Sequence, residues 1–200
     1  MELAEVLRRR RMTRAYDESR PVPADALEAV VAAALRAPSA GFSQGVSLLV
    51  LTTATERDSF WAATASGSSR WLAGMRTAPV LITVWTSREA YLDRYAEPDK
   101  GWTDRDPGRW SAPYWFVDAG MAAMASLLAA VDGGLGACFF GVPPDRVAAV
   151  REAFGVPAEQ LSVGVISLGH PAPDAVPSGS ARRRSRRPTG SLVHRGHWSG

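Results

Sequence analysis

The sequence predicts a single α+β domain with three layers, α-β-α, in which a helix runs through the middle. The chain has 200 residues and 46% apolar content, which is enough for one sizeable core. Strand-like runs alternate with helical segments without the strict repeat of a βαβ fold. Residues 117–131 (VDAGMAAMASLLAAV) are apolar all round, and this pattern is typical of a helix that is buried on every side.

The first half of the chain predicts two helices, then strands and helices in alternation. Leu3, Val6 and Leu7 have helical spacing within residues 2–11, which lead into an arginine-rich turn. Two prolines precede the second helix, at residues 24–35. The further expected elements are a breaker-rich loop at 38–45, a strand at 46–52, a helix at 55–75 interrupted around 66–69, and a strand at 78–85.

The second half begins with residues 86–115, where the regular pattern stops and prolines and glycines are mixed with tryptophans and tyrosines. Such a segment is typical of a lid or an interface excursion. We therefore expect one domain over residues 1–200, with this excursion at 86–115 and a basic C-terminal arm at 179–200. The remaining expected elements are the helix at 117–131, a strand at 137–140, a helix at 145–154, a strand at 161–168 and a possible late strand at 191–194.

The positive charge is concentrated at the two ends of the chain. The formal net charge is +3, but residues 179–200 hold six arginines and no acid, so the rest of the chain is net negative. A second cluster comprises residues 8–11 and Arg14. Two such clusters fit either a nucleic-acid surface or two chain ends that converge on one small phosphate. The arm offers only Trp198 as a stacking partner, so nucleic-acid binding is the remote alternative and no nucleic-acid partner is expected.

Several classes of protein are disfavoured. Cys138 is the single cysteine, which excludes a disulfide framework, and we interpret it as a small buried hydrophobe. The three histidines have no clustered acids around them, so no metal site is expected. The start lacks the pattern of a signal peptide, and the longest apolar run, 120–131, is too short for a bilayer. We expect a cytoplasmic protein with no membrane partner.

Three separate segments carry a family resemblance. They are an arginine turn at 9–17 (RRRMTRAYD), a Pro-Ser loop at 37–44 (APSAGFSQ) and a glycine entry at 134–141 (GLGACFFG). In this order, with the LGHP ending at 168–171 and the arginine-rich tail, they resemble the FMN-dependent nitroreductase family. The resemblance implies a mainly antiparallel sheet and an intertwined homodimer with FMN at its interface. It also implies an NAD(P)H-dependent flavin oxidoreductase that reduces a small electron-poor acceptor, such as a nitroaromatic or a quinone, by a ping-pong mechanism.

The expected site follows from this resemblance. A phosphate with nearly two charges needs charge-assisted donors, and arginine supplies them in pairs; Arg10, Arg14, Arg184 and Arg186 are the candidates. The resemblance assigns cofactor contacts to Arg10, Arg11, Met12, Arg14, Pro38, Ser39, Ala40, Phe42, Gln44, Leu135, Gly136, Phe140, Gly141, Arg184 and Arg186, of which Ser39, Ala40, Phe42 and Gln44 come from the partner subunit. It assigns the acceptor wall to Phe42, Trp102, Trp110 and Tyr114. No catalytic acid or base is expected, because flavin N5 performs the chemistry.

Two departures from the family pattern keep a second hypothesis open. Met12 stands where the family usually has serine, and Phe42 where it usually has asparagine. The alternative is a relative with the same fold and a different activity, which would be flavin-processing, dehalogenating, deazaflavin-using or flavin-storing. Simpler interpretations also remain for single features: a solvated helix end and a solvated arm for the two arginine clusters, a helix C-cap for residues 134–136, and a cover over the core for the tryptophans.

Overall fold

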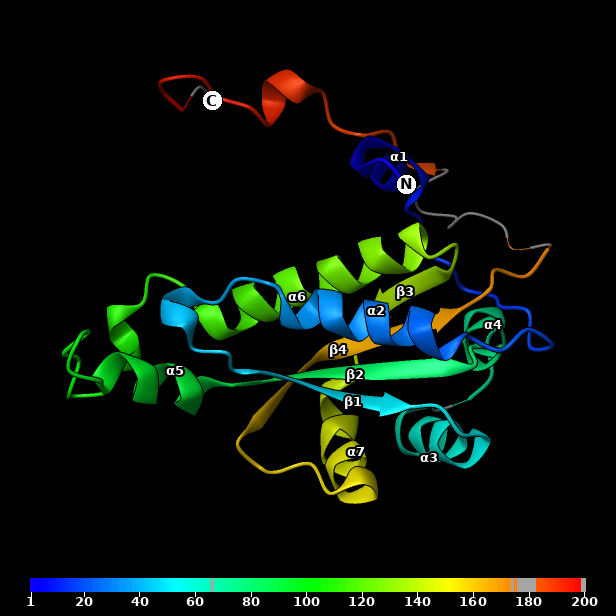
Figure 1. Ribbon diagram of the computed structural model, residues 1–200, viewed down its shortest axis with the longest axis horizontal. Helices are drawn as coiled ribbons and strands as arrows, with labels where there is room; N and C mark the ends of the chain where they lie inside the picture. The colour runs from blue at the N-terminus through cyan, green and yellow to red at the C-terminus, as the bar shows by residue number, and fades with distance from the viewer. Residues whose placement is uncertain (66, 174, 176–182, 199–200) are drawn as a thin grey trace.

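A four-stranded antiparallel sheet forms the centre of the domain, as the computed structural model shows for residues 1–65, 67–173, 175 and 183–198. The strand order is β1-β2-β4-β3, so the two central strands are β2 and β4 (Figure 1). Every ladder in the sheet is antiparallel, which confirms the expected α+β class. The strands are β1 (Val46–Leu51), β2 (Val80–Ser87), β3 (Gly136–Phe140) and β4 (Gln160–Gly169).

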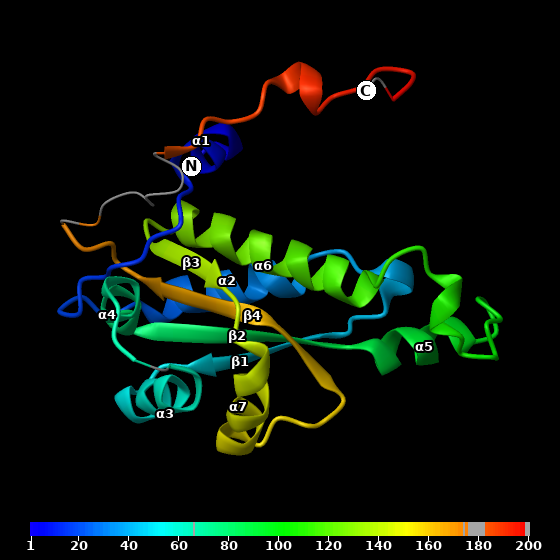
Figure 2. The same ribbon diagram turned by 180° about the vertical axis from the view of Figure 1, so that it is seen from behind.

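Helices cover both faces of this sheet and complete three layers (Figures 1 and 2). Strand β2 shows why, because Val80, Ile82 and Val84 belong to one core cluster while Leu81 and Trp85 belong to the other. Alternating residues of a strand point to opposite faces, so a strand that is apolar throughout needs cover on both sides. One face carries α2 (Ala24–Leu35) and α6 (Tyr114–Asp132), and the other carries α3 (Ala54–Thr64), α4 (Arg70–Arg76) and α7 (Val147–Phe154).

The end of α6 leads directly into β3. Gly134 has a φ of 74°, in the left-handed region that glycine adopts at low cost. Its N–H donates to the Val131 carbonyl at 3.0 Å, and the Leu135 N–H donates to the Ala130 carbonyl at 2.8 Å. These bonds satisfy the last carbonyls of the helix. The C-cap interpretation of this segment is therefore confirmed.

The structure corrects the expectation that the central helix is buried on every side. The sheet and α2 cover one side of α6, and the other side leaves an apolar stripe exposed: Phe116, Val117, Met121 and Met124. Composition alone does not show how many neighbours a helix has. By length and hydropathy α6 could cross a membrane, but half of its most apolar window is buried inside the domain, as in the core helix of a globular fold.

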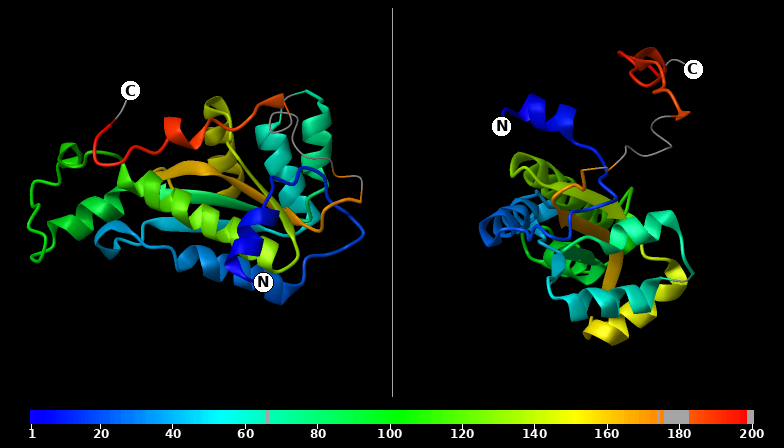
Figure 3. Two further views of the ribbon diagram at one scale, coloured as in Figure 1. Left: turned by 90° about the horizontal axis from the view of Figure 1, so that it is seen from above. Right: turned by 90° about the vertical axis from the view of Figure 1, so that its right-hand side faces the viewer.

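Two further differences concern the excursion and the tail. Residues 86–115 contain a helix, α5 (Arg88–Ala96), which the sequence pattern did not predict because its apolar residues form no clear stripe. The possible late strand at 191–194 is wrong, since Thr189–Ser191 is a short 3-10 turn and no ladder follows it in the described chain. Residues 183–198 project from the body of the domain, and nearly all of them are exposed (Figure 3). The expected arm at 179–200 lies partly outside the described residues.

Candidate functional site

The arginine turn lies along the edge of β3. The Thr13 N–H donates to the Ala137 carbonyl at 2.9 Å, and Met12 forms a parallel bridge with Ala137. The Met12 sulfur accepts from the Phe139 N–H at 3.5 Å. A side chain at Gly136 would place its Cβ 2.6 Å from the Thr13 hydroxyl oxygen, so the close approach of the two segments requires glycine. The structure thus brings together two of the three motif segments.

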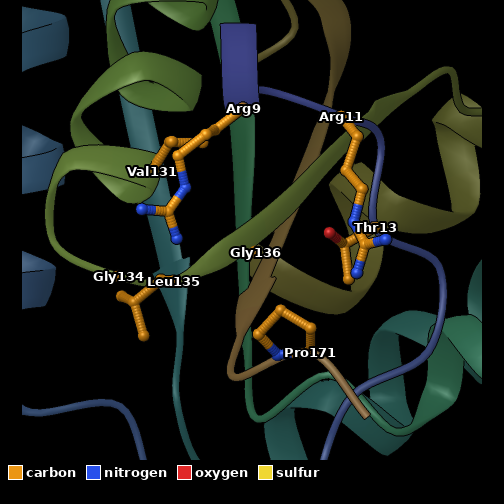
Figure 4. A pocket seen from close by; sticks show the side chains of 8 residues that line it. All are labelled: Arg9, Arg11, Thr13, Val131, Gly134, Leu135, Gly136 and Pro171. Atoms are coloured by element: carbon orange, nitrogen blue, oxygen red, sulfur yellow. The ribbon is translucent and has the colours of Figure 1, made fainter. Parts of the chain in front are cut away.

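A cavity of about 310 Å³ lies where these two segments meet, and we call it the arginine cavity. Figure 4 shows the Arg9 and Arg11 side chains reaching toward it, Arg9 from the end of α1 (Leu3–Arg9) and Arg11 from the turn. Two guanidinium groups beside a glycine-rich backbone form a suitable site for an anion. The lining residues are Arg9, Arg11, Thr13, Val131, Gly134, Leu135, Gly136 and Pro171.

The three predicted arginines of the turn lie in three different places. Arg11 lines the arginine cavity, as do the predicted Leu135 and Gly136, whereas Arg10 is the C-cap of α1 and does not line it. Arg14 lies near the Cys138 thiol; burial raises the pKa of that thiol, and the charge of Arg14 opposes the rise. Arg9 was missed because every arginine in the run 8–11 is an equal candidate until the helix end fixes their directions.

A second cavity, of about 230 Å³, lies at the other end of β3, and we call it the aromatic cavity. Phe140 and Gly141, both predicted, line it. The Trp61 ring stacks on Phe140 with centroids 5.9 Å apart, and Trp71 meets Phe140 edge-on at 5.5 Å. Sequence reasoning missed both tryptophans, although aromatic residues on the two sides of the interruption at 66–69 are a usable signal. The residues that line the aromatic cavity are Phe60, Trp61, Thr64, Ala65, Ser69, Trp71, Leu72, Phe140, Gly141, Val142 and Pro143.

The Pro-Ser loop lies elsewhere in the same chain, at the first turns of α6. The Ala40 N–H donates to the Asp118 carboxylate at 2.8 Å, and the Gln44 N–H donates to the Ser39 hydroxyl at 3.0 Å. A rise of about 1.5 Å per residue places Asp118 about 20 Å from the arginine cavity's Val131 along the helix axis. Neither Pro38 nor any other predicted residue of this loop lines either cavity.

The predicted acceptor wall forms a cluster of its own. Trp110 is central to it, with ring centroids 4.3 Å from Tyr95, 5.2 Å from Trp102 and 5.3 Å from Tyr114. Phe42, the fourth predicted wall residue, is 72% exposed. Within one chain these residues line neither cavity, and the Trp cluster covers α5.

The predicted phosphate ligands of the tail, Arg184 and Arg186, are exposed and line neither cavity in this chain. Over the described residues, no group of three His, Cys, Asp or Glu side chains could hold a metal ion.

The Nitroreductase family model matches residues 7–170, which include all four strands and every lining residue of the two cavities except Pro171. The chain therefore belongs to the nitroreductase family, a family of NAD(P)H-dependent flavin oxidoreductases.

Individual relatives agree with this assignment. A Methanothermobacter thermautotrophicus protein, provisionally named NADH dehydrogenase/NAD(P)H nitroreductase, is 29% identical over 174 residues, or 86% of this chain and 78% of its own. A provisionally named nitroreductase from Desulfovibrio desulfuricans, crystallised with FMN, is 26% identical with a TM-score of 0.73 over 100% of this chain and 99% of its own. Another FMN complex, from Exiguobacterium sibiricum, shares the fold at 19% identity, with a TM-score of 0.75 over 100% of this chain and 98% of its own.

Proposed function

We propose that this protein is an FMN-dependent oxidoreductase that transfers electrons from NAD(P)H to a small electron-poor acceptor, such as a nitroaromatic or a quinone, by a ping-pong mechanism. The main support for this proposal is the pair of cavities at the two ends of β3, of which one is cationic and the other aromatic. Gly136 and Phe140, which mark the two ends, are about 14 Å apart at about 3.4 Å per residue. Leu135 of the arginine cavity belongs to the core cluster on the α6 face, and Phe60 and Trp61 of the aromatic cavity belong to the cluster on the opposite face. An extended ligand with a phosphate at one end and a planar ring at the other would therefore reach both cavities across the edge strand β3.

The residues fit FMN in both charge and shape. Arg9 and Arg11 would hold the phosphate through charge-assisted hydrogen bonds. Phe140 and Trp71 would contact the isoalloxazine ring, and Arg14 lies on the same side of β3, beside Cys138. The positive charge of Arg14 favours negative charge that gathers on the ring. Bound FMN supplies the acceptance and donation of hydride at N5, so the protein contributes binding, orientation and electrostatics.

We also propose that the working form is a homodimer. The apolar stripe on α6 is exposed in a single chain, and so are Leu192, Val193 and Trp198 of the arm. Exposed apolar patches of this kind mark interaction sites. A second copy would cover the stripe, and it could bring the Pro-Ser loop and the tail arginines to the cavities from which they are separated within one chain.

The dimer can be tested on the stripe itself. Met121→Asp places a charge in its centre and is expected to yield a monomer by light scattering coupled to size-exclusion chromatography. Ala62→Asp, on the exposed side of α3 across the sheet, is the matched control and should remain dimeric. A monomeric wild-type protein would contradict the proposal.

A second candidate function on the same fold is favoured by two residues. Met12 uses its sulfur to accept from the Phe139 N–H where the family usually has a serine hydroxyl, and Phe42 is exposed on the Pro-Ser loop. Both remove polar contacts, which favours a relative with flavin-processing, dehalogenating, deazaflavin-using or flavin-storing activity.

An activity assay separates the two candidates. FMN-loaded protein is assayed for oxidation of NADH and NADPH with a quinone and with a nitroarene. Turnover with either donor and either acceptor supports the reductase. A protein that binds FMN tightly but oxidises neither nicotinamide with any such acceptor would favour the second function.

A further inference from the structure

Asp118 is a buried carboxylate within the apolar helix α6. Its side chain is 2% exposed, and the ion pairs found among the described residues do not include it. Burying a carboxylate is costly unless donors compensate it. Two donors do so at the same oxygen, the Tyr91 hydroxyl at 2.7 Å and the Ala40 N–H at 2.8 Å. One carboxylate oxygen thus joins α6, α5 and the Pro-Ser loop.

The Pro-Ser loop has a backbone that needs such support. Phe42 has a φ of 58° and Gln44 a φ of 53°, which are left-handed values that these side chains disfavour. Gly41, between Ala40 and Phe42, has a φ of 62°. Strained conformations persist only where the surroundings hold them, and they gather at ligand-binding segments. The Ala40 amide, held by Asp118, lies immediately before this strained stretch.

Helix α5 holds the loop from a second side. The Arg94 Nε–H donates to the Gly41 carbonyl at 2.8 Å. The rings of Tyr91 and Tyr95 lie so close to the loop that a Cβ added at Gly45 or Gly41 would approach them to 2.6 Å. The loop is therefore fixed both by hydrogen bonds and by steric contact, and the excursion at 86–115 supplies Tyr91, Arg94 and Tyr95 to these contacts. Burial and the Asp118 carboxylate both raise the pKa of the Tyr91 hydroxyl, so it remains a donor.

We propose that Asp118 is a positioning residue for the cofactor site: it fixes the Ala40 amide and thereby sets the geometry in which the Pro-Ser loop meets FMN. The inference rests on the proposed function, in which Ser39, Ala40, Phe42 and Gln44 contact the cofactor of the second subunit. A carboxylate accepts hydrogen bonds from two donors more strongly than a neutral acceptor does. This explains why position 118 has an aspartate although it is buried.

The test compares two buried polar residues of the same helix. Asp118→Ala removes the acceptor of the loop amide. Ser126→Ala is the matched control, because its hydroxyl is equally buried but donates to the Val30 carbonyl of α2 at 3.3 Å and not to the loop. Amide hydrogen exchange of residues 39–45 is measured without FMN, and the FMN dissociation constant and visible circular dichroism are measured with it.

In Asp118→Ala we expect at least tenfold faster exchange at Ala40, an FMN dissociation constant about tenfold higher, and an altered visible dichroism. Ser126→Ala should match the wild type in all three. Asp118→Asn keeps an acceptor oxygen and should lie between the two; it also provides the test if the alanine variant does not fold.

Either of two results overturns the inference. One is unchanged exchange and unchanged FMN binding in both Asp118 variants. The other is an equal effect of Ser126→Ala, which would show that any loss of a buried polar contact in α6 has the same consequence. A wild-type protein that binds no FMN contradicts the proposed function instead, while the exchange measurement still reports on the hold that Asp118 has on the loop.

Discussion

Gly136→Ala tests whether the arginine turn and the glycine entry form one unit. The added Cβ would lie 2.6 Å from the Thr13 hydroxyl oxygen and 2.9 Å from its Cβ and Cγ2. Thr13 is 3% exposed and its N–H is bonded to the Ala137 carbonyl, so it has little room to move. The substitution should therefore push the turn away from β3.

The expected cost combines two effects. Overpacking of a buried site costs about 1 to 3 kcal/mol. Stretching the hydrogen bond from Thr13 to Ala137 costs about 1 kcal/mol more. We expect the free energy of unfolding, measured in urea, to fall by about 2 to 4 kcal/mol, and FMN binding to weaken because Arg11 moves with the turn.

Two further variants make this prediction specific. Thr13→Ala in the Gly136→Ala background removes two of the three close contacts and should recover part of the lost stability, which a double-mutant cycle measures. Gly133→Ala is the control, because its added Cβ would make only an ordinary contact, 3.4 Å from the Ala129 carbonyl oxygen, and its φ of −76° suits alanine. A Gly136→Ala protein as stable as Gly133→Ala, with no coupling to Thr13, would refute the reasoning.

Three other perturbations test separate parts of the account. Arg11→Ala should raise the FMN dissociation constant by about tenfold or more in a fluorescence titration. Arg8 is an exposed arginine paired with Glu5, so Arg8→Ala should leave the dissociation constant unchanged. Equal effects of the two variants would contradict the assignment of the arginine cavity as the phosphate site. Phe140→Ala removes the stack on Trp61 and should lower the unfolding free energy by about 2 kcal/mol in urea, and an unchanged value would contradict that packing. Burial raises the pKa of the Cys138 thiol, so the folded protein keeps this thiol protonated at a pH where the unfolded chain, with a thiol pKa of about 8.5, loses the proton. The free energy of unfolding should therefore fall as the pH rises above about 8.5. Cys138→Ala should show a smaller fall between about pH 8 and 10, and a fall equal to that of the wild type would refute this.

Much of the fold is predictable because its elements carry strong local signals. The helix at 24–35 is observed with the same bounds, and the four expected core strands are all present within two residues at each end. These segments have clear apolar patterns and are bounded by glycine or proline. By contrast, α5 has no such stripe, and its cluster of tyrosine and tryptophan rings forms through contacts with a distant part of the excursion.

The site is only partly predictable, because its geometry depends on contacts between distant segments. The meeting of the arginine turn with the glycine entry follows from the motifs, but which arginines face the cavity depends on where α1 ends. Asp118 had a signal, as the lone acid near the start of an apolar helix, yet its role emerges only when Ala40 and Tyr91 are seen beside it. The exposed stripe of α6 could not be predicted either, because composition does not show which sides of a helix the rest of the chain covers.

The most direct test of the central claim is the visible spectrum of the purified protein without oxygen, before and after addition of NADH or NADPH. We predict the absorption of an oxidised flavin, which bleaches with at least one nicotinamide and returns when a quinone or a nitroarene is added. A protein that stays colourless after incubation with FMN would contradict the account, because the arginine and aromatic cavities would then not form a flavin site.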